Sequence, residues 1–140
     1  MPGPITGGCL CGAIRYSVSQ PLNKIIACHC THCQKVSGAG ASHNTFVPTS
    51  AVAFTAGKPK LFVDTAQSGN LVNRYFCGDC GSPLYSQRAN VPEIMVLKVG
   101  TLDAPVDMKV TVNIWTRSAR PWMYIDPGIE QYPESRPVKA

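Results

Sequence analysis

The sequence predicts a mainly β fold, a small β-sheet domain with little helix, and three observations lead to this prediction. Short apolar or alternating runs recur along the 140 residues and are separated by turn signals. Glycine and proline number twelve each, which favours short elements and many turns. No segment repeats its apolar residues convincingly at the 3.6-residue spacing of a helix. With 44% hydrophobic residues, the chain can bury an ordinary core, and we expect one domain over residues 1–140.

The first expected strand covers residues 12–20, where Ile14, Tyr16 and Val18 alternate with polar residues. The most apolar run, residues 93–99, is the expected central strand. Further short strands are expected at residues 52–54, 61–64, 70–76 and 110–115.

One short helix is expected after Cys30, over residues 31–36, ending at Ser37-Gly38. The prolines that recur from Pro121 to the end favour an extended strap. We expect Trp122 and Tyr124 of this strap to pack against the body of the protein rather than to stack on a ligand.

Charge and hydropathy exclude some classes of partner. Thirteen Lys and Arg against eight Asp and Glu give a net charge of +5, but these basic residues are spread almost evenly. A nucleic-acid-binding surface usually gathers them into a stripe, so we expect no nucleic-acid partner. No run approaches the ~20 apolar residues of a membrane helix. Residues 1–5 lack the features of a secretory signal. We therefore expect a cytoplasmic protein without a membrane partner, and the oligomeric state is left open.

The seven cysteines indicate metal binding. In a cytoplasmic chain, such a number points to metal or catalysis before disulfides. Structural zinc takes four ligands, usually as two pairs on tight turns. Cys9-x-Cys11 and Cys77-x-x-Cys80 are two such pairs, each with glycines beside it that permit a tight turn. We predict a structural zinc on these four cysteines.

The three remaining cysteines, Cys28, Cys30 and Cys33, lie close enough in sequence to reach one ion. Three protein ligands leave the fourth position of zinc open, which is typical of a catalytic site. The alternative is a site closed by a histidine. His43 is the best candidate for that ligand, because the other two histidines directly adjoin a cysteine ligand.

The chemistry of an open three-thiolate site follows from its charge. Three thiolates outweigh the charge of one zinc ion, so the site is poorly suited to making hydroxide and well suited to accepting a fourth sulfur. A substrate thiolate there could attack a small carbonyl and give a hemithioacetal, and the reverse is a carbon–sulfur lyase step. His29, His32 and His43 are candidate proton donors to the forming alkoxide. Lys35, His43 or Arg74 could contact the substrate, and the sequence does not rank them.

Four segments resemble motifs of the glutathione-dependent formaldehyde-activating (GFA) family of carbon–sulfur lyases. In chain order they are GGCLCGAIRY (7–16), CHCTHCQK (28–35) running on to Ser37-Gly38, FCGDCGSPL (76–84) and GTLD (100–103). Arg120-Pro121-Trp122 resembles the closing segment of the family. The resemblance covers nearly the whole chain with the cysteine spacings intact.

The resemblance implies an Mss4-like fold stapled by zinc, with a structural zinc on Cys9, Cys11, Cys77 and Cys80 and a catalytic zinc on the other three cysteines. The reaction associated with the family condenses glutathione with formaldehyde to S-hydroxymethylglutathione, so glutathione is the first candidate thiol. Gln34 is a departure, because many members carry arginine there. The family also extends to centromere protein V, so its motifs specify the metal sites better than the substrate.

Three alternatives to a lyase stand beside this interpretation. A zinc-stabilised, Mss4-like binding module without chemistry would be favoured by closure of the second zinc site by His43. A nucleic-acid-binding zinc ribbon would need a basic stripe interleaved with aromatic residues, which the sequence lacks. A methionine sulfoxide reductase would need a cysteine outside the zinc sites, and all seven are assigned.

Overall fold

The structure is a computed structural model that describes residues 4–104 and 106–136. The strands are β1 (Ile5–Gly8), β2 (Arg15–Val18), β3 (Lys24–Cys28), β4 (Ser42–Pro48), β5 (Val52–Ala56), β6 (Lys60–Thr65), β7 (Leu71–Phe76), β8 (Pro83–Arg88), β9 (Ile94–Lys98), β10 (Lys109–Ile114) and β11 (Glu130–Gln131). The helices are α1 (Thr31–Ser37) and three 3₁₀ turns, η1 (Thr49–Ala51), η2 (Val99–Thr101) and η3 (Thr116–Ser118). The predicted mainly β fold is confirmed.

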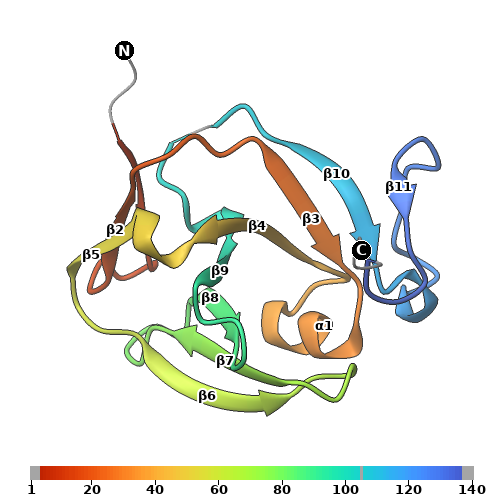
Figure 1. Cartoon of the computed structure of the whole chain (residues 1–140), viewed down its shortest axis with the longest axis horizontal. Coiled ribbons are helices and arrows are strands. Elements are labelled where there is room, and N and C mark those ends of the chain that lie inside the picture. The colour runs from red at the N-terminus through yellow and green to blue at the C-terminus, as the bar shows by residue number, and fades with distance from the viewer. Residues whose placement is uncertain (1–3, 105, 137–140) are drawn as a thin grey trace.

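The strands form two sheets (Figure 1). One has three strands in the order β1-β2-β5, and the other has eight in the order β11-β10-β3-β4-β9-β8-β7-β6. No helix in the described part of the chain is long and apolar enough to cross a membrane.

Most of the elements predicted from local patterns are confirmed. Ile14, Tyr16 and Val18 are buried as their alternation predicts, although the ordered strand is shorter than residues 12–20 because the chain first turns around its cysteine pair. Strand β9 lies inside the large sheet between β4 and β8, as predicted for a central strand. Helix α1 ends where predicted, at Gly38, which has a φ of 68°. Strands β1, β3, β4, β8 and β11 were not predicted from the sequence. Polar residues obscure the alternation of β4 and β8, and β11 has only two residues.

The hydrophobic core lies between the small sheet and one face of the large sheet. Tyr16 and Val18 of β2 meet Val47 of β4 and Leu97 of β9 in one buried cluster. In this region Phe54 packs edge to face on Tyr16 and tilted on Tyr85, and Tyr75 stacks on Tyr85. This core positions the large sheet so that its opposite face is left for α1.

Helix α1 is bound to both ends of the large sheet. At one end, the Nδ1 atom of His32 donates to the carboxylate of Asp64 on β6, at 2.8 Å. At the other, the Nε2 atom of Gln34 donates to the carbonyl of Ser118, after β10, at 2.9 Å. The sheet therefore curls around the helix, which lies between β6–β7 and β3–β10 in Figure 1.

The segment that follows Pro121 differs from its prediction. Trp122 and Tyr124 are 70% and 79% exposed, so neither is buried. The ring of Trp122 nevertheless lies beside Gly40, where an added Cβ atom would come within 3.0 Å of it. The predicted packing against the body is therefore limited to this contact for Trp122 and is wrong for Tyr124. Backbone pairing holds the segment instead, because β11 pairs in parallel with β10 and the amide of Tyr132 donates to the carbonyl of Asn113. Residues 1–3, on which part of the prediction about a secretory signal rests, lie outside the described residues. Residues 137–140, the end of the expected strap, also lie outside them.

Two leucines test where the stability of this fold lies. Leu97 is 0% exposed in the core and Leu71 is 51% exposed at the start of β7. We expect Leu97→Ala to lower the free energy of unfolding by about 2–5 kcal/mol, because it leaves a cavity. Leu71→Ala should cost less than about 1 kcal/mol. Urea denaturation of the metal-replete proteins checks this, and similar losses for both variants would contradict the described core.

Candidate metal centres

The first set of cysteines joins the loops of two hairpins. Cys9 and Cys11 lie in the loop between β1 and β2, and Cys77 and Cys80 lie in the loop between β7 and β8. All four Sγ atoms lie within 4.8 Å of one another, and we call this set the four-cysteine cluster. Because the two hairpins belong to different sheets, the cluster connects the sheets.

The geometry of the four-cysteine cluster suits a tetrahedral thiolate site. The Sγ atom of Cys11 lies 3.6 Å from that of Cys9 and 3.8 Å from that of Cys77. Four sulfurs at the zinc–thiolate bond length would be about 3.8 Å apart in a tetrahedron. The backbone amides of Ile14 and Asp79 donate to the sulfurs of Cys9 and Cys77, at 3.3 and 3.4 Å, which stabilises thiolates. The cluster could therefore hold a metal ion.

Glycine closes each of these two loops. Gly12 and Gly81 directly follow the second cysteine of each pair, with φ angles of 83° and 80°. Such left-handed conformations are readily adopted by glycine and costly for residues with a Cβ atom. The permissive role predicted for the glycines beside the cysteine pairs is confirmed at these two positions.

The second set of cysteines is gathered where β3 meets α1. Cys28 ends β3, Cys30 is the N-cap of α1, and Cys33 lies in the first turn of the helix. The three Sγ atoms lie within 4.8 Å of one another and all three residues are buried. Ile114 and Trp115, at the end of β10, pack against this three-cysteine cluster. It too could hold a metal ion.

The electrostatics of the three-cysteine cluster favour a bound cation. Hydrogen bonds from Cys28 and Cys30 lower the pKa of Cys33 to about 2. Hydrogen bonding to Cys30 and Cys33, together with burial, raises the pKa of Cys28 above its ordinary value. Ionisation of one thiol therefore opposes ionisation of the other two. A divalent cation would remove this conflict, because it stabilises all three thiolates at once.

No histidine belongs to either cluster in the part of the chain that the structure describes. On β4, His43 follows Ser42, which pairs across the sheet with Cys28. Successive residues of a strand point to opposite faces, so the exposed side chain of His43 points away from the face that carries Cys28. Fully buried His29 is engaged elsewhere, with its Nε2 atom 2.9 Å from Oδ1 of Asn113.

The third predicted proton donor, His32, is oriented by a carboxylate. Asp64 accepts hydrogen bonds from Nδ1 of His32 and from Nε of Arg74, both at 2.8 Å. Burial alone would raise the pKa of Asp64, but hydrogen bonds from His32 and Arg74 outweigh it and lower the pKa. Because a carboxylate can only accept, Nδ1 of His32 carries the proton and Nε2 is the atom that can exchange one with a substrate.

Sequence reasoning missed three buried polar residues beside the three-cysteine cluster. The Nδ2 atom of Asn44 donates to the hydroxyl of Ser42 at 2.9 Å, and Nζ of Lys98 donates to Oδ1 of Asn44 at 2.7 Å. Burial lowers the pKa of Lys98, and the nearby cysteine thiolates oppose this effect. The sequence offers one indication of these three residues, because Lys98 lies within the most apolar run of the chain. The register of β4 and β9 brings the rest together.

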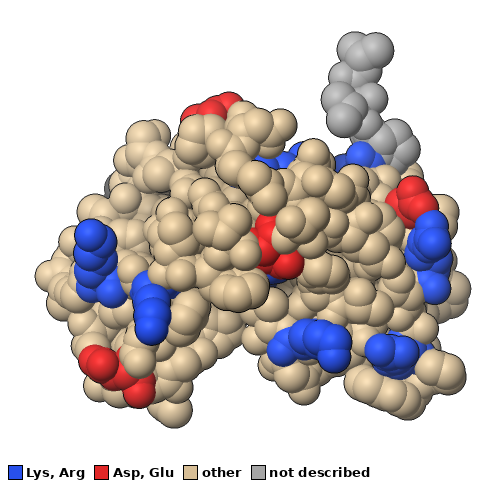
Figure 2. All heavy atoms as spheres, turned by 90° about the horizontal axis from the view of Figure 1, so that it is seen from below, with Lys and Arg blue, Asp and Glu red and all other residues tan. Residues whose placement is uncertain are grey.

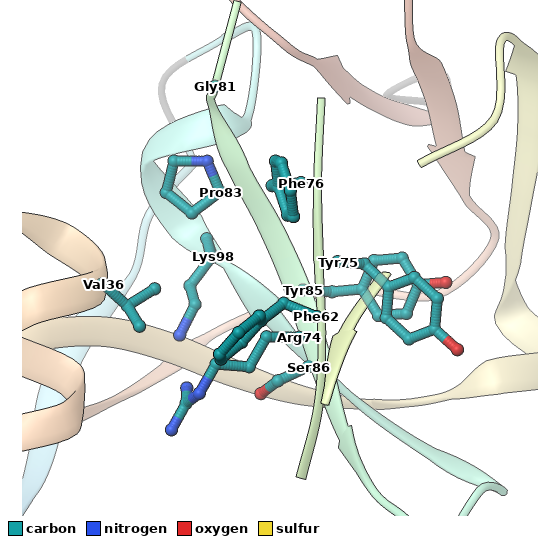
Figure 3. A pocket seen from close by; sticks show the side chains of 10 residues that line it. All are labelled: Val36, Phe62, Arg74, Tyr75, Phe76, Gly81, Pro83, Tyr85, Ser86 and Lys98. Carbon is teal, nitrogen blue, oxygen red and sulfur yellow. The ribbon is translucent and has the colours of Figure 1, made fainter. Parts of the chain in front are cut away.

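A cavity of about 200 Å³ opens on the same face of the sheet. Its polar lining includes Lys98, Arg74 and Ser86, and its apolar lining includes Val36 of α1 and Phe62 of β6. Figure 3 shows the nitrogen ends of Lys98 and Arg74 pointing to one side, away from the two tyrosines on the far side of the strands. Of the three substrate contacts considered from the sequence, Arg74 is the one that lines this cavity.

The departure at Gln34 has a structural role. Its Nε2 atom donates to the carbonyls of His29 and Ser118, at 2.8 and 2.9 Å, and its Oε1 atom accepts from Nε of Arg120 at 2.7 Å. The amide is thus engaged within the chain, where it connects α1 to the segment after β10.

Figure 2 shows how charged side chains are distributed on one face of the protein. Lys and Arg stand apart on this face, with Asp and Glu among them, and do not form a stripe. This agrees with the even spread of basic residues in the sequence.

Comparison with known proteins agrees with the cysteine motifs. Residues 4–118 match the family model described as "Glutathione-dependent formaldehyde-activating enzyme". A Penicillium rubens protein named "Putative glutathione-dependent formaldehyde-activating enzyme" is 36% identical over 92 residues, or 61% of this chain and 46% of that protein. The chain thus spans about half the length of that curated relative. A crystal structure of a Rhodobacter sphaeroides protein, 22% identical, shares the fold with a TM-score of 0.55 over 74% of this chain and 99% of its own.

Serine substitutions should separate the two clusters by their effects. Cys77 lies 66 residues from Cys11, so metal binding there closes a long loop and is coupled to folding. We expect Cys77→Ser to be insoluble or unfolded. Cys33→Ser should stay folded and lose about one metal ion per chain. Circular dichroism and elemental analysis of the purified proteins check both outcomes. Equal damage from the two substitutions would contradict a division between a structural and a functional site.

Proposed function

The chain belongs to the glutathione-dependent formaldehyde-activating enzyme family, and we propose that it is a zinc-dependent carbon–sulfur lyase that forms or cleaves a thiol–aldehyde adduct. Glutathione is the proposed thiol, formaldehyde the proposed aldehyde, and S-hydroxymethylglutathione their adduct. The observation that carries this proposal is the buried three-cysteine cluster, which no histidine joins among the described residues and which lies on the cavity-bearing face of the sheet. We propose that the enzyme acts as a single domain in the reducing cytoplasm, where thiolate ligands persist.

The two clusters suit two zinc ions with different roles. The thiolates of Cys9, Cys11, Cys77 and Cys80 complete a tetrahedron by themselves, as in a structural site, whereas a three-cysteine set leaves one position for a ligand from solution. A zinc ion held by Cys28, Cys30 and Cys33 would accept the sulfur of the substrate and keep it deprotonated at neutral pH.

The chemical step needs one proton to move. In the forming direction the thiolate sulfur attacks the carbonyl carbon, a carbon–sulfur bond forms, and the carbonyl electron pair moves to oxygen, which takes a proton. Cleavage reverses each change. We assign this proton transfer to Nε2 of His32, because Asp64 fixes the Nδ1–H of the ring and the residue directly precedes Cys33. His29 is less suited because Asn113 engages it inside the protein.

The alternative function, a zinc-stabilised binding module without chemistry, depends on a fourth protein ligand. His43 is the candidate for that ligand, and its position on the opposite face of β4 from the cysteine cluster disfavours it. Binding of a thiol separates the two functions, because a closed site has no position for a substrate sulfur.

We expect a small thiol to bind the zinc-replete protein and to release a proton as it does so, because its sulfur must be deprotonated to become a ligand. Calorimetry in buffers of different ionisation enthalpy measures that proton. Cys30→Ser should lose the thiol binding, whereas Lys109→Met, at the exposed start of β10, should retain it. A fully metallated protein that binds no thiol, or binds one without proton release, would favour the binding module.

We expect a modest acceleration of adduct formation that is largest at low pH. The reaction also proceeds without an enzyme, and a free thiol of pKa ~8.5 is only a few per cent thiolate near neutral pH. Complete deprotonation therefore raises the thiolate fraction by at most about 30-fold at about pH 7, and the gain shrinks as the pH approaches about 9. Positioning of the carbonyl would increase the acceleration beyond this factor, and the lower nucleophilicity of a metal-held thiolate would decrease it.

Exchange NMR on the thiol–formaldehyde equilibrium measures this rate at matched thiol concentrations. The acceleration should be absent in Cys30→Ser and weakened in His32→Gln, which keeps its size but cannot exchange a proton. If the rates with zinc-replete protein equal the uncatalysed rate from about pH 6 to about pH 8, the lyase assignment for this thiol is contradicted.

A further inference from the structure

A row of polar side chains crosses the face of the large sheet that α1 covers. It runs from the three-cysteine cluster to the cavity and consists of Cys28, Ser42, Asn44, Lys98, Ser86 and Arg74. The pairing registers of β3, β4, β9, β8 and β7 place these side chains on one face, because directly paired and alternate residues of an antiparallel sheet share a face. The cavity and the cysteine cluster thus lie on the same face of the sheet, with these polar side chains between them.

The cavity end of this row has two buried cations. Lys98 and Arg74 are only 9% and 8% exposed. The hydrogen-bond partner of Lys98 is the neutral amide oxygen of Asn44, and Arg74 uses its Nε atom on Asp64. The terminal nitrogens of Arg74 point to the same side as the Lys98 ammonium (Figure 3).

Burying two positive charges is costly unless anions compensate them. The cysteine thiolates supply negative charge from one end of the row, and Asp64 supplies it beside Arg74. Neither Asp64 nor any cysteine lines the cavity. An anion inside the cavity would therefore stabilise both cations, and the guanidinium of arginine matches the two oxygens of a carboxylate.

We propose that this cavity binds the carboxylate of an acidic thiol, held by Lys98 and Arg74, while the sulfur of the same molecule reaches the three-cysteine cluster. The inference rests on the proposed function, because it requires a thiol at that cluster. The volume, about 200 Å³, is below the ~300–1,000 Å³ of pockets that enclose whole drug-sized ligands. The cavity thus fits a small mercapto acid or one carboxylate-bearing arm of glutathione, with Val36 and Phe62 against its methylene groups.

A matched pair of thiols tests the inference. 3-Mercaptopropionate and its amide have nearly the same size and differ by the carboxylate charge. Calorimetry on zinc-replete protein, without aldehyde, should show the acid binding about tenfold more tightly or better, as expected for charge-assisted hydrogen bonds. Lys98→Met should remove most of this preference. Arg74→Gln should act in the same direction. The control Lys109→Met, which removes an exposed charge on β10, should keep the preference.

The outcomes separate this inference from the proposed function. Equal affinities of the wild-type protein for the two thiols, each bound with proton release, would overturn the carboxylate site and leave the lyase proposal standing. A preference that persists in both Lys98→Met and Arg74→Gln would overturn the assignment to these residues. Binding of neither thiol would overturn the proposed function and this inference with it. If Lys98→Met fails to fold, the wild-type comparison and Arg74→Gln decide the question.

Discussion

The architecture depends on the meeting of two hairpin loops at the four-cysteine cluster. These loops belong to different sheets, and the core is enclosed between those sheets, so it is complete only when the loops meet. Hydrogen bonds also join the β1–β2 hairpin to residues 101–103, which follow β9. Asp103 accepts hydrogen bonds from Thr6 and Arg15, and the hydroxyl of Tyr16 lies 2.6 Å from that of Thr101. The first and last of the four sequence motifs thus act together, as the structural frame in which a metal would bind.

The hydrophobic core and the candidate functional site lie on opposite faces of the large sheet. One face packs in the core, and the other carries the polar row, the three-cysteine cluster and α1. Because side chains alternate along a strand, neighbouring residues serve different purposes. On β9, Leu97 is in the core while Lys98 belongs to the row. On β4, Ser42 faces the cysteines while His43 points away, and no histidine joins the three-cysteine cluster among the residues that the structure describes.

The alternation of side chains along the strands explains how much of the fold and of the candidate site could be predicted from the sequence. Local signals identified what local residues determine: the buried side of β2, the two cysteine pairs, and the end of α1 at Gly38. Local sequence patterns could not predict contacts that depend on strand register. The hydrogen bond from Lys98 to Asn44, for example, joins positions 54 residues apart. Strand β4 was missed because it is polar on a face that serves the site. The exposure of Trp122 was missed because hydrophobicity does not determine which way a ring points.

The backbone is strained at Trp115, beside the three-cysteine cluster. Trp115 has a φ of 57°, and it is the one non-glycine residue with a positive φ among residues 4–104 and 106–136. For a bulky residue this conformation costs on the order of 1–3 kcal/mol and persists only where the surroundings enforce it. Here the carbonyl of Ile114 accepts from the amide of His29, and the amide of Trp115 donates to the carbonyl of Glu134. Trp115 packs against the three-cysteine cluster. The one strained non-glycine residue among those that the structure describes therefore lies in the wall of the three-cysteine cluster, the candidate functional site, as is common for strained residues.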